Sequence, residues 1–94
     1  MEVKELKDGK VDEIELEITE IGDERNVNSR YGGGRVCDAV GNDETGSVSV
    51  SLWNDEIDAV SVGNKIRITN GWVREWNNVL QLSAGRYGKL EVVE

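Results

Sequence analysis

Apolar and polar residues alternate strictly between Ser47 and Trp53. Successive side chains of a strand point to opposite faces, so this pattern predicts a strand with one apolar face and one polar face. The apolar set is Val48, Val50 and Leu52, and the opposite set is Ser49, Ser51 and Trp53. A tryptophan on the hydroxyl-bearing face has little use in a core, so we expect a flat ligand to lie against it.

The clearest other alternation predicts a strand from Lys10 to Ile21. It is preceded by a short turn or helical start over Val3–Asp8, in which Leu6 is expected to pack against the strands. A row of glutamates occupies the outward face, which indicates a solvated surface or, alternatively, a surface that repels nucleic acid or binds a basic partner. The inward residues are Ile14, Leu16 and Ile18.

Lys65 to Trp76 predicts another strand, but its apolar positions change parity along the way. The inward candidates Ile66 and Ile68 are even-numbered, whereas Val73 is odd-numbered. A bulge at Asn70-Gly71 would reset the alternation and keep all three inside. The residues then sent outward are Trp72, Arg74 and Trp76.

Shorter patterns predict the remaining strands. Arg35 to Val40 is expected to be a strand that the polar turn at residues 41–46 joins to the serine-rich strand as a hairpin. Asn77-Asn78 suits a two-residue turn with positive φ, leading into a strand over Val79–Ser83. Lys89–Val92 is expected to form a closing extended segment.

Two segments are predicted to lie outside the strands. Asn54 is expected to cap a short helix that carries Ile57 and Val60 on one side and is stopped by Gly63. Residues 22–34 are polar and contain three consecutive glycines, so we expect a mobile loop. Five strands with one short helix between strands 3 and 4 predict an all-β, five-stranded OB-fold Greek-key barrel that fills residues 1–94 as a single domain.

Composition excludes several kinds of chemistry. The chain has one cysteine, Cys37, and no histidine, which rules out an internal disulfide, a structural zinc site and any histidine-based triad. We therefore expect no enzyme activity, no cofactor and no metal. No apolar run is long enough to span a membrane, and the acidic N-terminus does not resemble a signal peptide, so a cytoplasmic location is expected.

The net charge of −8 argues at first against a nucleic-acid partner, but its distribution changes that argument. Residues 1–24 carry ten acids and three lysines, whereas residues 25–94 carry nine acids and eight bases. The larger part of the chain is thus nearly neutral, and a local basic lining is possible.

The succession of motifs resembles the OB-fold domains of archaeal replication protein A and single-stranded DNA-binding proteins. The resemblance covers the chain from Leu6 to about Leu90. It departs from the family in its acidic first strand and in a smaller number of basic residues. The motifs are Asp43-Glu44-Thr45-Gly46, Leu52-Trp53-Asn54, Gly63-Asn64-Lys65-Ile66-Arg67-Ile68, Asn70-Gly71-Trp72 and Gln81-Leu82-Ser83-Ala84-Gly85-Arg86.

The resemblance implies non-sequence-specific binding of single-stranded DNA, in support of DNA replication, repair and recombination. In that family aromatic residues stack on bases, and the matching positions here are Trp53, Trp72 and Trp76. The additional candidates are arginines for phosphate and one auxiliary aromatic, namely Arg30, Arg35, Arg74, Arg86 and Tyr31. Weak binding over a few nucleotides with a shallow salt dependence is expected.

The resemblance also suggests a nucleoid-associated protein, and one OB module of a longer protein with further domains or subunits of the replication protein A kind as partners. Two alternatives stay open at the level of sequence. The tryptophans could bury against another protein, with the acidic strand selecting a basic surface. The ligand could also be single-stranded RNA, because residues that read the 2′-hydroxyl are not visible in a sequence.

Overall fold

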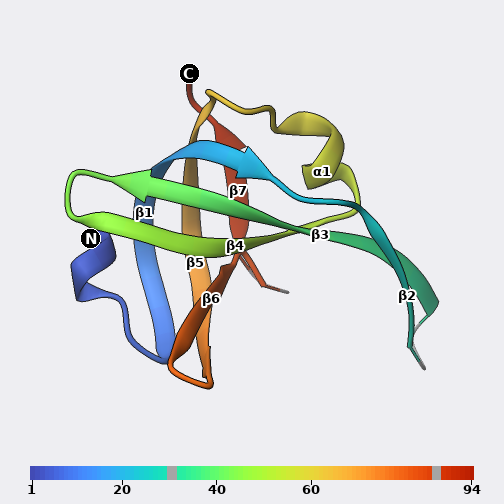
Figure 1. The fold of residues 1–94 in the computed structure, drawn as a ribbon, viewed down its shortest axis with the longest axis horizontal. Helices are drawn as coiled ribbons and strands as arrows, with labels where there is room; N and C mark the ends of the chain where they lie inside the picture. Colours follow the sequence, from blue (N-terminus) through green and yellow to red (C-terminus); the bar gives the residue numbers. More distant parts are fainter. Residues whose placement is uncertain (30–31, 86–87) are drawn as a thin grey trace.

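The structure is a computed structural model that describes residues 1–29, 32–85 and 88–94. Arg30, Tyr31, Arg86 and Tyr87 lie outside the described residues. Strands dominate the described residues, which also form one 3₁₀ turn and one short helix (Figure 1). In chain order the elements are η1 (Val3–Glu5), β1 (Gly9–Ile21), β2 (Arg25–Ser29), β3 (Gly32–Asp43), β4 (Gly46–Trp53), α1 (Asp55–Ala59), β5 (Lys65–Trp76), β6 (Val79–Ser83) and β7 (Lys89–Val92).

Five of these strands close into a barrel in the order β1, β3, β4, β6, β5, because β5 also pairs with β1. The β4–β6 pair is parallel and the other barrel pairs are antiparallel. β2 is added beside β3, and β7 beside β5. α1 lies between β4 and β5, the third and fourth barrel strands, so the predicted OB-fold barrel is confirmed.

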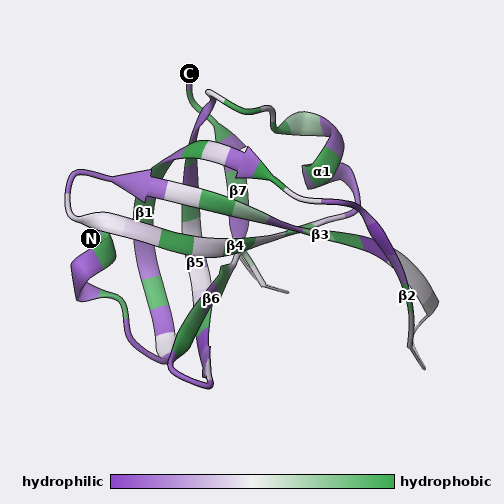
Figure 2. Cartoon of the chain, in the orientation of Figure 1, coloured by the Kyte–Doolittle hydropathy of each residue, from purple (hydrophilic) through white to green (hydrophobic). Residues whose placement is uncertain are grey.

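The barrel interior is aliphatic, as the alternation predicted. Figure 2 shows hydrophobic and hydrophilic bands alternating along β1 and β3. Every barrel strand contributes, and the largest side chains with almost no exposed surface are Ile14, Leu16, Ile18, Leu52, Ile66, Ile68 and Leu82. Cys37 is buried among them, and burial, followed by the nearby charge of Asp38, raises the pKa of its thiol.

The change of parity in β5 is confirmed, but it is not a bulge in one strand. Ile68 and Val73 are both fully buried, and Asn70 between them has a φ of 53°. β1 shows the same irregularity, since Asp12 and Glu13 are consecutive exposed residues. The β1–β5 register is therefore the same on both sides, from Val11 opposite Gly71 to Glu13 opposite Thr69. Both strands shift phase together at Asp12 and Asn70, which are not paired with each other. The even-numbered side chains of β5 from Trp72 onward therefore point outward while the register is kept.

The expected loop at residues 22–34 is wrong for most of its length. Arg25–Ser29 forms β2, which pairs with an extended β3 that begins at Gly32 rather than Arg35 and continues to Asp43. The β2–β3 hairpin reaches away from the barrel (Figure 1). Because no core lies under this hairpin, its residues show no apolar alternation, and the sequence pattern gave no strand signal there.

The ends of α1 also differ from the prediction. Asn54 has a φ of 50° and makes no side-chain cap; its side-chain Oδ1 accepts a hydrogen bond from the Arg35 backbone N–H at 2.9 Å. The helix ends at Ala59, and Gly63, with a φ of 97°, belongs to the turn that follows. Val60 is buried in the core as expected.

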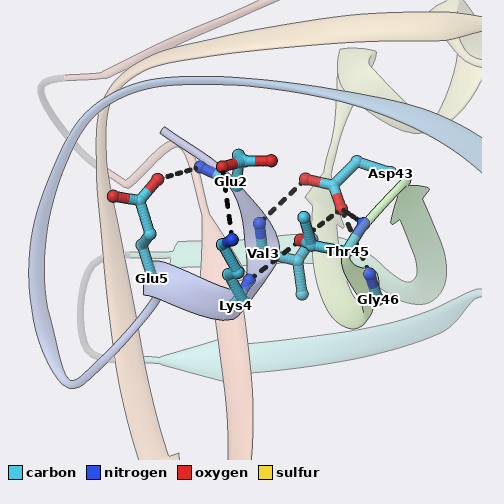
Figure 3. Close-up of polar contacts among 7 residues, drawn as sticks. All are labelled: Glu2, Val3, Lys4, Glu5, Asp43, Thr45 and Gly46. Carbon is cyan, nitrogen blue, oxygen red and sulfur yellow. Dashed lines mark hydrogen bonds and ion pairs between the residues drawn. The ribbon is translucent and has the colours of Figure 1, made fainter.

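The N-terminal turn is fastened to the β3–β4 turn by the carboxylate of Asp43 and by a hydrogen bond from the Lys4 N–H to Thr45 Oγ1 at 3.1 Å (Figure 3). Asp43 accepts hydrogen bonds from the Val3 N–H at 2.8 Å, from the N–H and the hydroxyl of Thr45 at 2.7 Å each, and from the Gly46 N–H at 3.2 Å. Desolvation opposes ionisation, but these hydrogen bonds outweigh it and lower the pKa of Asp43. Leu6, just after η1, is buried as predicted.

Candidate nucleic-acid interface

The register of three adjacent strands brings the outward residues of β4, β6 and β5 onto one face. Ser51 lies opposite Ser83 in the parallel β4–β6 pair, and Ser83 lies opposite Trp72 in the β5–β6 pair. Two residues earlier in β6, Gln81 lies opposite Ser49 of β4 on one side and opposite Arg74 of β5 on the other. Directly opposite residues share a face, so these rows form one continuous surface.

All three tryptophans are exposed and lie outside the barrel core, which confirms that they point outward. The exposed fractions are 42% for Trp53, 48% for Trp72 and 78% for Trp76. Trp53 lies directly opposite Val36, which is buried although it does not belong to the core cluster. Exposed aromatic side chains are the feature on which bases stack in proteins that bind single strands.

Trp72 lines a hollow of about 760 Å³ with a basic rim. Among its described lining residues, Lys10 and Arg74 contribute positive charge, and Asn70, Ser83 and Gly85 contribute polar groups and backbone. Arg74 is exposed, and no acid in the described part of the chain pairs with it. The arrangement offers an aromatic plane beside cationic groups, which suits a base and its phosphate.

Trp53 lines a second hollow, of about 580 Å³, which shares Ser83 and Gly85 with the first. Its other wall is the start of α1, where Asp55 and Glu56 bring negative charge. The backbone N–H of Trp53 donates to Glu56 Oε1 at 2.9 Å. Burial raises the pKa of Glu56, and this hydrogen bond opposes the rise.

Hydrogen bonds between polar side chains link neighbouring strands on this face. Gln81 Nε2 donates to Ser51 Oγ at 2.7 Å and to Asp38 Oδ1 at 3.2 Å. Gly85 has a φ of 70°, in the region that favours glycine, and a Cβ there would lie 3.9 Å from the Cβ of Trp72. Gly85 lines both hollows, and no side chain separates them at this position.

Arg35, which the sequence predicts to contact phosphate, forms ion pairs within the domain. Its guanidinium pairs with Glu24 at 2.8 Å and with Asp58 of α1 at 3.0 Å. Hydrogen bonds to Asp58 and Glu24 raise its pKa further above an already high value. Arg35 is therefore charge-compensated and ties α1 to β3. The predicted site residues Arg30, Arg86 and Tyr31 fall outside the described residues.

Lys10 is a residue of this face that the sequence did not reveal. It lies at the start of β1, directly opposite Trp72 in β5, and lines the same hollow. Its only acidic partner among the described residues is the exposed Asp12, at 3.8 Å. The juxtaposition depends on the β1–β5 register across 62 residues of chain, for which local patterning contains no signal.

The glutamate row lies on a separate part of the surface. Glu13 and Glu15 are opposite Thr69 and Arg67 in the first half of β5, whereas the tryptophan face uses its second half. Arg67 pairs with Glu15 at 2.7 Å and with Glu13 at 3.3 Å. The strand β5 therefore carries an acidic neighbourhood at one end and the aromatic face at the other.

Other kinds of site find no support in residues 1–29, 32–85 and 88–94. These residues contain no group of three or more metal-binding side chains. Among the same residues, no helix has the length and apolar character required to cross a membrane.

A closed five-stranded Greek-key barrel defines the OB-fold class, whose members bind oligonucleotides or oligosaccharides, and exposed aromatic residues in a basic groove are features of the members that bind single strands. The family model described as "Single-stranded DNA binding protein Ssb-like, OB fold" matches residues 6–92. The chain belongs to this family, as the sequence motifs had indicated.

A relative of the chain comes from an archaeon. It is 26% identical over 77 residues to the single-stranded DNA binding protein Ssb of Saccharolobus solfataricus, and the match covers 82% of this chain and 52% of the relative. The chain thus spans about half the length of that protein.

Solved structures share the fold at low sequence identity. An OB domain from Thermoplasma acidophilum superposes with a TM-score of 0.81 at 20% identity, covering 100% of this chain and 86% of that one. The second OB-fold domain of replication protein A from Methanococcus maripaludis gives 0.76 at 22% identity, covering 100% and 94%.

Proposed function

We propose that this domain binds single-stranded DNA, with bases stacked on Trp53, Trp72 and Trp76. The observation that carries the proposal is the exposure of all three indoles on one surface formed by β4, β6 and β5. In OB-folds the face of the second and third barrel strands and the loops beside it bind oligonucleotides. Here β4, which carries Trp53, is the third barrel strand. The name of the Saccharolobus solfataricus relative, a single-stranded DNA binding protein, supports the same reading.

Stacking alone gives a modest affinity. Each base stacked on an aromatic side chain is worth about 1–3 kcal/mol, and micromolar binding needs about 8 kcal/mol. Three platforms reach that value only near the upper end of the range, before the cost of ordering the strand. Weak binding by the isolated domain follows, and several such domains in one chain would be required for tight binding.

Phosphate contacts supply the rest of the binding. Arg74 and Lys10 flank Trp72, and we place one phosphate between them. The predictions for Arg30, Arg86 and Tyr31 are retained. The ion pairs of Arg35 with Glu24 and Asp58 favour a structural role for that residue. Each phosphate neutralised on a single strand adds about −0.7 to the slope of log affinity against log salt, so a slope of about −2 is expected.

A titration with oligo-dT, followed by tryptophan emission, tests this proposal. The paired variants are Trp72→Ala and Trp72→Phe, because phenylalanine keeps a stacking plane and alanine removes it. We expect Trp72→Ala to weaken binding about 5- to 150-fold and Trp72→Phe to restore most of the loss. Unchanged affinity in Trp72→Ala, with folding verified by circular dichroism, would exclude stacking on this residue.

We further propose that the domain serves replication, repair or recombination together with other domains of the same kind. The support is the likeness to a replication protein A domain and the coverage of only about half of the Ssb relative. The first partner in this proposal is single-stranded DNA. Other domains or subunits of a replication protein A-like assembly are the second kind of partner. Subunits that co-purify with the protein are then treated with nuclease. Co-purification that is lost upon this treatment indicates contact through DNA, and co-purification that is retained indicates direct contact.

A further inference from the structure

The two hollows on the tryptophan face differ in charge. The hollow of Trp72 is lined by the cations Lys10 and Arg74. The hollow of Trp53 is lined by Asp55 and Glu56, and none of its described lining residues is a cation. Phosphate is attracted to the first and repelled by the second. A strand lying across both hollows would therefore turn a base, and not a phosphate, toward the start of α1.

The carboxylate of Glu56 is hydrogen-bonded to the backbone of Trp53 and lines the same hollow as its side chain. Its Oε1 accepts the backbone N–H of Trp53 at 2.9 Å, and its side chain is only partly exposed. A carboxylate offers about four lone-pair directions and, when ionised, no donor. One direction is used by this hydrogen bond, so others are available to a donor on a base that stacks on the indole.

We propose that Glu56 makes the Trp53 hollow selective for a base that carries an exocyclic amino group over thymine, with cytosine as the test case. The inference rests on the proposed function. A carboxylate accepts a hydrogen bond from cytosine N4, whereas thymine presents its O4 acceptor at the same position. Oxygen facing oxygen adds repulsion at this position. The one ring donor of thymine, N3–H, lies between two carbonyl oxygens that would also face the carboxylate, so thymine is disfavoured at this hollow.

Equilibrium titrations with dC and dT oligomers of equal length, about 12 nucleotides each, test this selectivity. Tryptophan emission gives the Kd of each oligomer, and the quantity compared is the ratio of the dT Kd to the dC Kd. For the unaltered protein we expect dC to bind about 3- to 10-fold more tightly.

The informative variant is Glu56→Gln, because glutamine keeps an acceptor for the Trp53 N–H while its amide can also donate to thymine O4. The ratio should fall to about one or invert, through tighter dT binding and weaker dC binding. Glu17→Gln is the matched control: it removes the same charge from the outward face of β1, away from both hollows, and should leave the ratio unchanged.

The possible failures are distinct. Equal binding of dC and dT, or a ratio that Glu56→Gln does not change, would overturn the selectivity and leave stacking intact. Failure to bind either oligomer would overturn the proposed function itself. An equal change in the ratio upon Glu17→Gln would show that net charge, and not the Trp53 hollow, is responsible.

Discussion

Lys10 lies directly opposite Trp72, where the start of β1 pairs with the second half of β5. Cross-strand neighbours are close enough for an ammonium group and an indole to act on the same ligand. The chain as a whole is strongly acidic, yet this pairing and Arg74 give the Trp72 hollow a positive rim.

Lys10→Ala should therefore reduce both the affinity for oligo-dT and its dependence on salt. Lys10 shares one phosphate with Arg74, so its loss weakens that contact and is expected to make the slope of log affinity against log salt less steep by at most about 0.7. Titrations at four salt concentrations measure it. Lys65→Ala serves as the control, since Lys65 is also exposed but lines the acidic hollow at the other end of β5. A slope that falls equally in both variants would contradict a local role for Lys10.

Arg35 and Arg74 should respond oppositely to substitution by alanine. Arg35→Ala breaks ion pairs with Glu24 and Asp58, so it should lower the Tm by a few degrees and leave oligo-dT affinity within about twofold. Arg74→Ala should weaken binding and leave the Tm unchanged. Thermal unfolding and titration of both variants check this contrast. Strong loss of binding in a fully stable Arg35→Ala would instead support the phosphate contact predicted from the sequence.

The contribution of Asp43 to stability should depend on pH. Its folded-state pKa is lowered, so the ionised carboxylate stabilises the fold above the ordinary value of 3.8, and this stabilisation is lost as the pH falls through the lowered pKa. The Tm difference between the unaltered protein and Asp43→Asn should be largest near neutral pH and shrink below about pH 4. Glu44→Gln, at an exposed neighbour, should give a small difference at every pH. A difference for Asp43→Asn that persists in acid would contradict the role of its charge.

Asn70 should be needed for the change of phase that turns Trp72 outward. Its φ of 53° is tolerated by asparagine and glycine but costs other residues about 1–2 kcal/mol. Asn70→Ala is expected to lower the free energy of unfolding by about 1 kcal/mol, and Asn70→Gly to lie within about 0.5 kcal/mol of the unaltered protein. Denaturant unfolding measures both. Equal stability of all three proteins would argue against backbone strain at this position.

Most of the barrel could be predicted from the sequence because its strands carry apolar residues on one face. The range Lys65–Trp76 agrees with β5 at both ends, and the parity argument correctly placed Trp72 outward. β2 was missed because a hairpin that stands away from the core needs no apolar alternation. The cap by Asn54 was wrong because its side chain bonds to the backbone of Arg35 in a neighbouring strand.

The site was predictable only as far as its aromatic residues. Three tryptophans on polar faces are visible in a sequence, whereas the neighbours that give each hollow its charge are set by strand pairing. Lys10 reaches Trp72 through the β1–β5 register, and Arg35 is directed to Asp58 by the docking of α1. Such long-range partners leave no local pattern.

The central claim is that the tryptophan face, and not the acidic face, receives the DNA strand. Nuclear magnetic resonance tests it most directly, because the three indole N–H groups give three resolvable side-chain signals. On addition of oligo-dT we expect all three to shift, together with backbone signals of Ser83 and Gly85, while those of Glu13, Glu15 and Glu17 stay in place. Indole signals that do not move, or shifts concentrated on the glutamate row, would contradict the account.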